Sequence, residues 1–136
     1  MTNVPNVADD HAAIRNLVAH YCLRLDHDDI DGWIALFTPD ATYDVYGRTF
    51  RGQEGIRKMV TGAPGGLHLG GAPTIEILDD DRAHVEHNLL FISRSDGEMR
   101  SAVYDDEVVR TPHGWRIASL RCRFIVADGL SDRPSS

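Results

Sequence analysis

The feature of this sequence that most constrains its fold is a single apolar stripe in the first quarter of the chain. Six residues recur at the spacing of one face of an α-helix, namely Ile14, Leu17, Val18, Tyr21, Cys22 and Leu25. The pattern predicts an amphipathic helix within residues 10–31, whose stripe must pack on a core. Asp26 follows one turn after Cys22, so its carboxylate falls at the edge of the buried face. It is either paired with another polar group or is a capping and surface acid.

Length and charge limit the classes of function. The 136 residues suit one domain that is large enough to enclose a ligand cavity. The 21 acidic residues outnumber the 14 basic ones, giving a formal charge of -7. This balance, without a Lys/Arg cluster, argues against nucleic acid or an anionic membrane surface as the partner. A small molecule or another protein remains.

The cysteines and the hydropathy indicate the compartment. Cys22 and Cys122 fit no metal-ligand spacing and are too few for a disulfide framework, so we expect buried, reduced thiols. No stretch approaches the roughly 18 apolar residues of a membrane-spanning helix. The first ten residues lack the basic and apolar regions of a signal peptide. We therefore expect a cytoplasmic protein without a membrane partner.

The order of the predicted elements indicates an α+β fold. After the first helix, a short helix is predicted over residues 30–37, a strand over 41–46 that turns at Gly47 into 48–51, and a helix over 53–60. Four β-like runs separated by turn residues follow, over residues 67–78, 83–93, 99–110 and 115–126. Long strands with short turns imply an antiparallel meander. The helices would lie on one face of this curved sheet and enclose a cone-shaped pocket.

The two ends of the chain lack these patterns. Residues 1–8 precede the helical stripe, and residues 127–136 are rich in Gly, Asp, Pro and Ser. We therefore expect one domain over residues 9–126, between an N-terminal extension and a flexible tail.

Strand alternation selects candidates for the pocket. His87 alternates with Phe91 and so shares an apolar face with it, whereas His84 points to the opposite face. The two histidines therefore diverge and do not form a metal pair. Tyr43 and Tyr46 fall on opposite faces of their strand, so at most one of them reaches the pocket.

Several local motifs carry a resemblance to a known superfamily. They are the Ala-Ala-Ile start at residues 12–14, the helix junction at 25–33, and the segments at 36–41, 51–56 and 114–117. Together with the order of elements, they resemble the SnoaL-like branch of the nuclear transport factor 2-like (NTF2-like) superfamily over about residues 9–126. The resemblance implies the cone fold. That fold hosts enzymes, binding modules and subunits alike, so it does not by itself assign a function.

Within the superfamily, the sequence is similar to lyases of the scytalone dehydratase, hexachlorocyclohexane dehydrochlorinase and bile acid 7α-dehydratase types. These share an Asp at the end of the first helix and a His at the start of the strand after the third helix. Asp26 and His68 occupy these positions. The resemblance implies that the carboxylate fixes the imidazole tautomer and that His68 is a general base. Without the resemblance, the pair reads as two buried polar groups that satisfy each other.

Further site residues follow from the resemblance. Tyr21 stands where the bile acid dehydratase also has Tyr, and its phenol could polarise a carbonyl or leaving oxygen or serve as a core aromatic. His87 is either a second proton carrier or structural. Arg110 matches an Arg of the dehydrochlorinase site that would steady a developing anion, or it is solvated. Ala102 and Tyr104 replace the Ser and Asn of scytalone dehydratase, which argues against the fungal substrate.

The expected site therefore combines Asp26, His68 and Tyr21 as catalytic residues with a set of substrate contacts. These contacts are Trp33, Tyr46, His87, Phe91, Tyr104 and Arg110. Glycines at 66 and 70 would leave the backbone beside His68 uncrowded, so that a substrate could approach the imidazole.

The expected function is a cofactor-independent lyase. It would carry out a dehydratase-type elimination on a small hydrophobic cyclic, polyketide- or steroid-like substrate. No phosphate loop or ligand cluster indicates a cofactor or a metal. An isomerase or cyclase of the same fold, and a non-catalytic binding or interaction domain, stay open. The relatives imply a homodimer or homotrimer.

Overall fold

The computed structural model describes residues 6–134 of the chain. The apolar stripe lies on α1 (Val7–Asp26), which begins earlier than predicted because Asn6 caps its first turn. The Asn6 side chain accepts from the backbone N–H groups of Ala8 and Asp9 at 2.9 and 3.2 Å. The helix ends at Asp26, before the rest of the acidic run, and Asp28 then takes a left-handed φ of 59°.

Two shorter helices follow, α2 (Ile30–Ile34) and α3 (Gly52–Thr61). The prediction that α2 reaches residue 37 is wrong, because sheet pairing takes over at that point. The carbonyl of Leu36 accepts the N–H of Ile117 at 2.8 Å, and Phe37 already begins strand β1 (Phe37–Val45). No helix among residues 6–134 combines the length and the apolar character that crossing a membrane requires.

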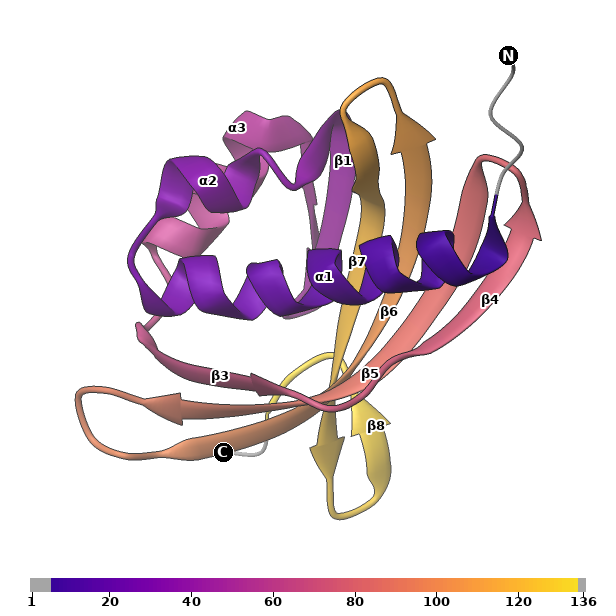
Figure 1. Cartoon of the computed structure of the whole chain (residues 1–136). Helices are drawn as coiled ribbons and strands as arrows, with labels where there is room; N and C mark the ends of the chain where they lie inside the picture. The colour runs from indigo at the N-terminus through magenta and orange to yellow at the C-terminus, as the bar shows by residue number, and fades with distance from the viewer. Residues whose placement is uncertain (1–5, 135–136) are drawn as a thin grey trace.

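One curved sheet of eight strands forms the rest of the fold (Figure 1). Its main path has the order β2-β1-β7-β6-β5-β3, with β4 beside β5 and β8 beside β7. The further strands are β2 (Arg48–Arg51), β3 (Gly66–Gly70), β4 (Thr74–Asp79), β5 (Arg82–Ser93), β6 (Met99–Thr111), β7 (Gly114–Val126) and β8 (Gly129–Ser131). All pairs are antiparallel except β1 with β7, which are parallel. The predicted antiparallel meander did not include β1, and no short turn joins β1 to β7 and fixes their directions.

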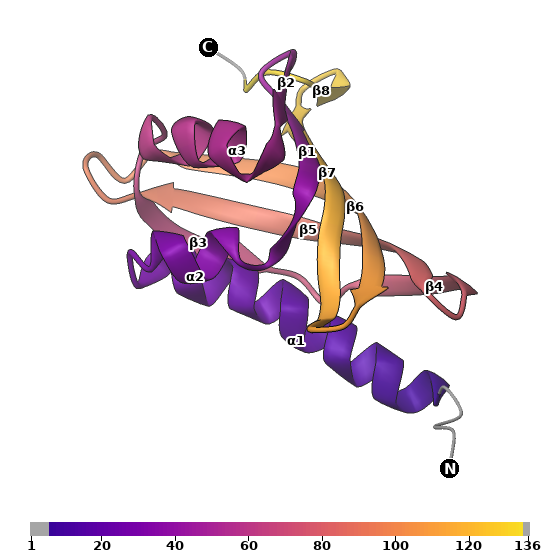
Figure 2. The same cartoon turned by 90° about the horizontal axis from the view of Figure 1, so that it is seen from above.

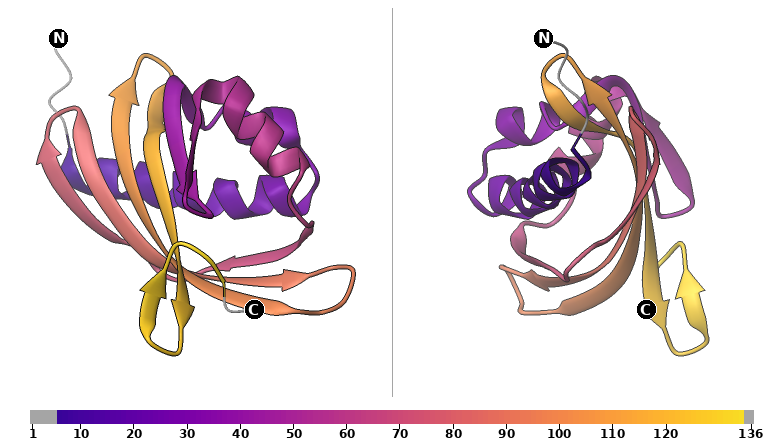
Figure 3. Two further views of the ribbon diagram at one scale, coloured as in Figure 1. Left: turned by 180° about the vertical axis from the view of Figure 1, so that it is seen from behind. Right: turned by 45° about the vertical axis from the view of Figure 1, so that its right-hand side comes forward.

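The three helices lie on the concave face of the sheet, as the view from above and the views from behind and at 45° show (Figure 2, Figure 3). The core forms between these two layers, and among its fully buried side chains are Ile14, Trp33, Phe37, Ile56 and Ile117. This arrangement confirms the predicted α+β cone with helices on one face.

Two predicted segments differ in the structure. The run over residues 67–78 is two strands, β3 and β4, because Gly71, Ala72 and Pro73 interrupt it and a proline cannot donate to a sheet ladder. The region expected to be a flexible tail contains β8, which pairs with β7 around a turn where Gly129 has a φ of 123°. Val7 and Ala8, expected in the extension, belong to α1. Residues 1–5 and 135–136 lie outside the described part.

Candidate active site

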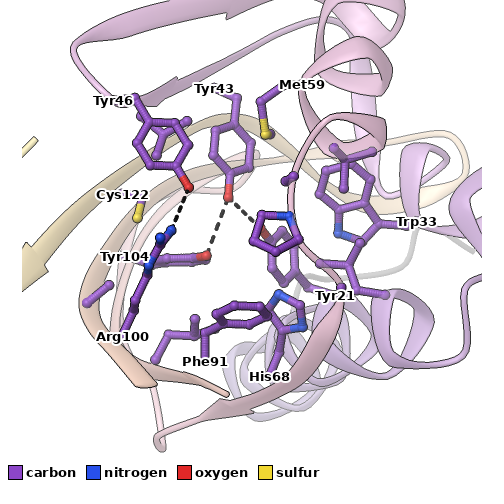
Figure 4. Close-up of a pocket in the computed structure, with 18 of the residues that line it drawn as sticks. Tyr21, Trp33, Tyr43, Tyr46, Met59, His68, Phe91, Arg100, Tyr104 and Cys122 are labelled. Carbon is purple, nitrogen blue, oxygen red and sulfur yellow. Dashed lines mark hydrogen bonds between the residues drawn. The ribbon is translucent and has the colours of Figure 1, made fainter. Parts of the chain in front are cut away.

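A cavity of about 360 Å³ lies between the helices and the concave face of the sheet. Its walls are largely aromatic and aliphatic and include Phe124, together with Trp33, Met59 and Phe91 (Figure 4). Trp33 and Phe91 were both predicted as substrate contacts. The volume is at the small end of the range for small-molecule sites. The cavity can therefore hold a compact, mostly apolar molecule.

Asp26 and His68 meet at the wall of this cavity. Nδ1 of His68 lies 2.8 Å from Oδ1 of Asp26, and the backbone N–H of His68 donates to both carboxylate oxygens at 3.1 Å. Because Nδ1 faces the carboxylate, Nε2 is the ring nitrogen left to meet a ligand. The side chain of Asp26 is 18% exposed and that of His68 is 14% exposed. His68 lines the cavity (Figure 4).

Strand β3 places His68 through close packing. Its Cα partner on β5 is Phe91, and the imidazole and phenyl ring centroids are 4.9 Å apart. A Cβ added to Gly66 would lie 2.1 Å from the carbonyl oxygen of Ile92. The prediction that the flanking glycines leave open space is therefore wrong at Gly66. This glycine instead lets β3 approach β5 closely enough to hold His68 in place.

Three tyrosine hydroxyls form a chain in the wall of the cavity. The hydroxyl oxygens of Tyr21 and Tyr43 are 2.6 Å apart, and the Tyr43 hydroxyl donates to that of Tyr104 at 3.4 Å (Figure 4). Burial is the main cause that raises the pKa of each phenol well above its ordinary value. The three hydroxyls are therefore neutral at neutral pH and can take part as hydrogen-bond donors.

Tyr46 also lines the cavity, so both Tyr43 and Tyr46 face it. The prediction that at most one could do so is wrong, because β1 ends at Val45 and Tyr46 has a left-handed φ of 58° in the following turn. The strand alternation does not extend through such a residue. The Tyr46 ring stacks on Phe124, with centroids 5.6 Å apart.

Two predicted site residues lie elsewhere. His87 is buried and bonded through Nδ1 to the carbonyl of Asn88, and its ring packs edge-on against Tyr104 at 5.4 Å. Arg110 donates to the carboxylate of Asp10 at 2.7 Å and lies over the ring of Trp115. Neither residue contributes to the cavity lining. The alternation gave the correct face for both, but it could not tell which part of a long, curved strand borders the cavity.

The cavity contains two arginines that the sequence patterns had not singled out, Arg94 and Arg100. Arg100 is on the same strand face as Ala102 and Tyr104, so the alternation that selected Tyr104 could have selected it as well. Arg110 shares this face too, but at the opposite end of β6.

Among residues 6–134, one group of histidine and carboxylate side chains lies close enough together that it could hold a metal ion. The potential ligand atoms of His84, Glu86 and Asp105 lie within 4.8 Å of one another. They belong to the face of the sheet opposite His87, and Asp105 also pairs with Arg123. This confirms that His84 and His87 diverge, and it separates the group from the cavity.

Comparison with solved structures places the fold. A variant of a protein of unknown function from Mycobacterium tuberculosis is 26% identical, with a TM-score of 0.77, over 86% of this chain and 77% of that one. A candidate scytalone dehydratase from Novosphingobium aromaticivorans is 20% identical, with a TM-score of 0.81, over 95% and 91%. A type 3 hexachlorocyclohexane dehydrochlorinase from Novosphingobium barchaimii is 20% identical, with a TM-score of 0.76, over 95% and 92%.

The last two likenesses show that this chain shares its fold with proteins named as lyases. No curated protein sequence matches the chain. The sequence pattern of the SnoaL-like domain matches residues 6–121, which is most of the chain. The curved sheet, the helices on its concave face and this match together show that the chain belongs to the SnoaL-like domain family.

Proposed function

We propose that the protein is a cofactor-independent lyase that removes water from a small cyclic substrate. The observation that carries the proposal is the bond of 2.8 Å between His68 Nδ1 and Asp26 at the wall of an apolar cavity. A base beside a cavity that can hold the substrate is what proton abstraction from carbon requires. The likeness in fold to a dehydratase and a dehydrochlorinase supports the same reaction class.

The first step is proton abstraction by Nε2 of His68. The proton comes from a carbon beside a carbonyl group, and the C–H electron pair becomes the new carbon–carbon double bond as the neighbouring C–O bond breaks. Asp26 holds the imidazole in the required tautomer and stabilises the imidazolium that forms. The departing hydroxide takes the proton from the imidazolium and leaves as water, which restores His68.

The tyrosine chain supplies a hydrogen bond to the substrate oxygen on which negative charge develops during the elimination. Each phenol has one proton. Because Tyr43 donates to Tyr104, the short contact between Tyr21 and Tyr43 uses the proton of Tyr21. The proton of Tyr104 is then the one that remains for a ligand. We therefore assign the donor role to Tyr104, with Tyr21 and Tyr43 orienting it, rather than to Tyr21 directly.

A turnover assay with a β-hydroxytetralone tests the proposal, because loss of water gives a naphthol with a distinct absorbance. The wild-type protein should accelerate this reaction, and His68→Gln should lower kcat by roughly 10²- to 10⁴-fold. His84→Gln is the matched control, since His84 also contacts a carboxylate, at 3.2 Å, but on the opposite sheet face. Equal rates for wild type and His68→Gln would reject His68 as the base.

A further inference from the structure

Arg100 and Tyr46 form a further polar group of the cavity, on the side opposite His68. Arg100 and Tyr46 face each other on one side, whereas Trp33 and His68 lie on the other (Figure 4). Nη1 of Arg100 donates to the Tyr46 hydroxyl at 3.4 Å. A guanidinium has five N–H donors, so this long bond leaves most of its capacity unused.

Sheet register fixes the distance between the two sides. His68 on β3 is the Cα partner of Phe91 on β5, and Phe91 is the partner of Arg100 on β6. Directly paired residues project to the same face, so the three side chains form one row across the concave surface. Two strand spacings separate the Cα atoms of His68 and Arg100 by about 10 Å. The ring of Phe91 is the apolar floor between the base and the cation.

Arg100 is also the cavity cation with the weaker carboxylate contact. Its Nε lies 3.9 Å from Oε1 of Glu98, which is beyond hydrogen-bond distance. Arg94 reaches Oδ1 of Asp28 at 3.5 Å, and its side chain is 60% exposed against 28% for Arg100. A partly desolvated guanidinium that lacks a close carboxylate favours an anionic ligand, and its fork matches the geometry of a carboxylate.

We propose that Arg100 and Tyr46 bind a carboxylate of the substrate. The substrate class is then a flat, ring-bearing carboxylic acid that lies on Phe91, with its acid group at Arg100 and its activated C–H at His68. This inference rests on the proposed function for the role of His68. The carboxylate subsite itself depends only on binding.

Calorimetric titration with naphthoate and with neutral naphthamide tests the subsite. The wild-type protein should bind naphthoate about tenfold more tightly than naphthamide, because a hydrogen bond to a charged group is stronger than a neutral one. Arg100→Met should remove this preference and leave the Kd of naphthamide within about twofold. Arg94→Gln is the matched control and should retain the preference. Equal binding of the two probes by wild type would overturn the proposal.

Two further variants distinguish a carboxylate subsite from a structural role of Arg100 and from the role of the base. Arg100→Lys keeps the charge but not the fork and should retain only part of the preference. If Arg100→Met weakened both probes equally, its role would be structural and the subsite would be rejected. His68→Gln should keep the ratio of the two Kd values, because the probes differ only in the group that meets Arg100. If a β-hydroxytetralone that bears a carboxylate loses no water while the naphthoate preference is preserved, the lyase is rejected and the carboxylate subsite is kept.

Discussion

Helix α1 carries two buried or nearly buried acids, and they meet opposite surroundings. Near its start, Asp10 accepts from Arg110 at 2.7 Å and from the indole N–H of Trp115 at 3.3 Å. At its end, Asp26 accepts from His68. Both acids bind a side chain of the sheet. The first partner, Arg110, lies over the ring of Trp115 and away from the cavity, whereas the second, His68, borders the cavity. The two pairs therefore differ in whether the partner of the acid can reach a ligand in the cavity.

The largest expected effect is a loss of activity when Asp26 is substituted, with almost no loss when Asp10 is substituted. Asp26→Asn removes the charge that stabilises the imidazolium and favours the wrong tautomer of His68, so kcat should fall by roughly 10²-fold or more. Asp10→Asn should leave kcat within about twofold, because Asp10 lies outside the cavity. The β-hydroxytetralone assay measures both variants. Equal losses of activity would erase the distinction between the two ends of α1.

The free energy of unfolding should show the opposite order, with the larger loss on substitution of Asp10. Asp10 is 7% exposed and bonded to both Arg110 and Trp115. Asp10→Asn should therefore lower the free energy of unfolding by about 1–3 kcal/mol, since Arg110 and the buried Trp115 lose a charged acceptor. Chemical denaturation with urea gives this value. The surface variant Asp128→Asn is a control that should change stability by less than about 0.5 kcal/mol.

The pair of Asp10 and Arg110 should also make the free energy of unfolding depend on pH. The hydrogen bond from Arg110 is the main cause that holds the pKa of Asp10 below its ordinary value. A depressed pKa in the folded state gives stability that is present above the unfolded value of about 3.9 and is lost as pH falls through the folded value. The stability gap between wild type and Asp10→Asn should therefore be full at pH 6 and shrink below about pH 4. A gap that grows on acidification would contradict the assigned direction.

The smallest expected effect is on kcat and concerns Tyr104 in the wall of the cavity. Tyr104→Phe removes the phenol proton that is left for a ligand, and kcat should fall about tenfold. Tyr46→Phe is the matched control, since Tyr46 also lines the cavity but belongs to the Arg100 side. It should change kcat by less than about threefold and affect the Kd of naphthoate instead. A larger loss of kcat in Tyr46→Phe would reverse the two roles.

Much of the fold could be predicted from local patterns. The helical stripe that contains Ile14 and Tyr21 was visible because one buried face imposes a period of 3.6 residues. The long strands β5, β6 and β7 were located within about two residues because turn residues separate them. Less visible were the parallel pairing of β1 with β7 and the short strand β8. Both depend on partners that are distant in sequence or on a few residues of weak preference.

The site was predicted only in part, for a related reason. The resemblance placed Asp26 and His68, and the structure brings their side chains together. Alternation assigned Tyr104 and Arg110 to one face of β6, which is correct, but only Tyr104 borders the cavity. Arg100 satisfies the same pattern and was missed. Period 2 reports the face of a strand, whereas the cavity covers only part of that face.

Within the regular helices and strands, the sequence by itself determined which side chains face the concave layer, because apolar burial repeats with the period of the element that carries it. It also indicated that an acid, Asp26, lies at the end of the first helix and that a histidine, His68, follows the third helix. Only the tertiary structure decided that Asp26 borders a cavity while Asp10 is sealed by packing, and that His68, Phe91 and Arg100 form one row. The physical reason is that these relations arise from sheet register and curvature, which depend on contacts between residues far apart in the chain.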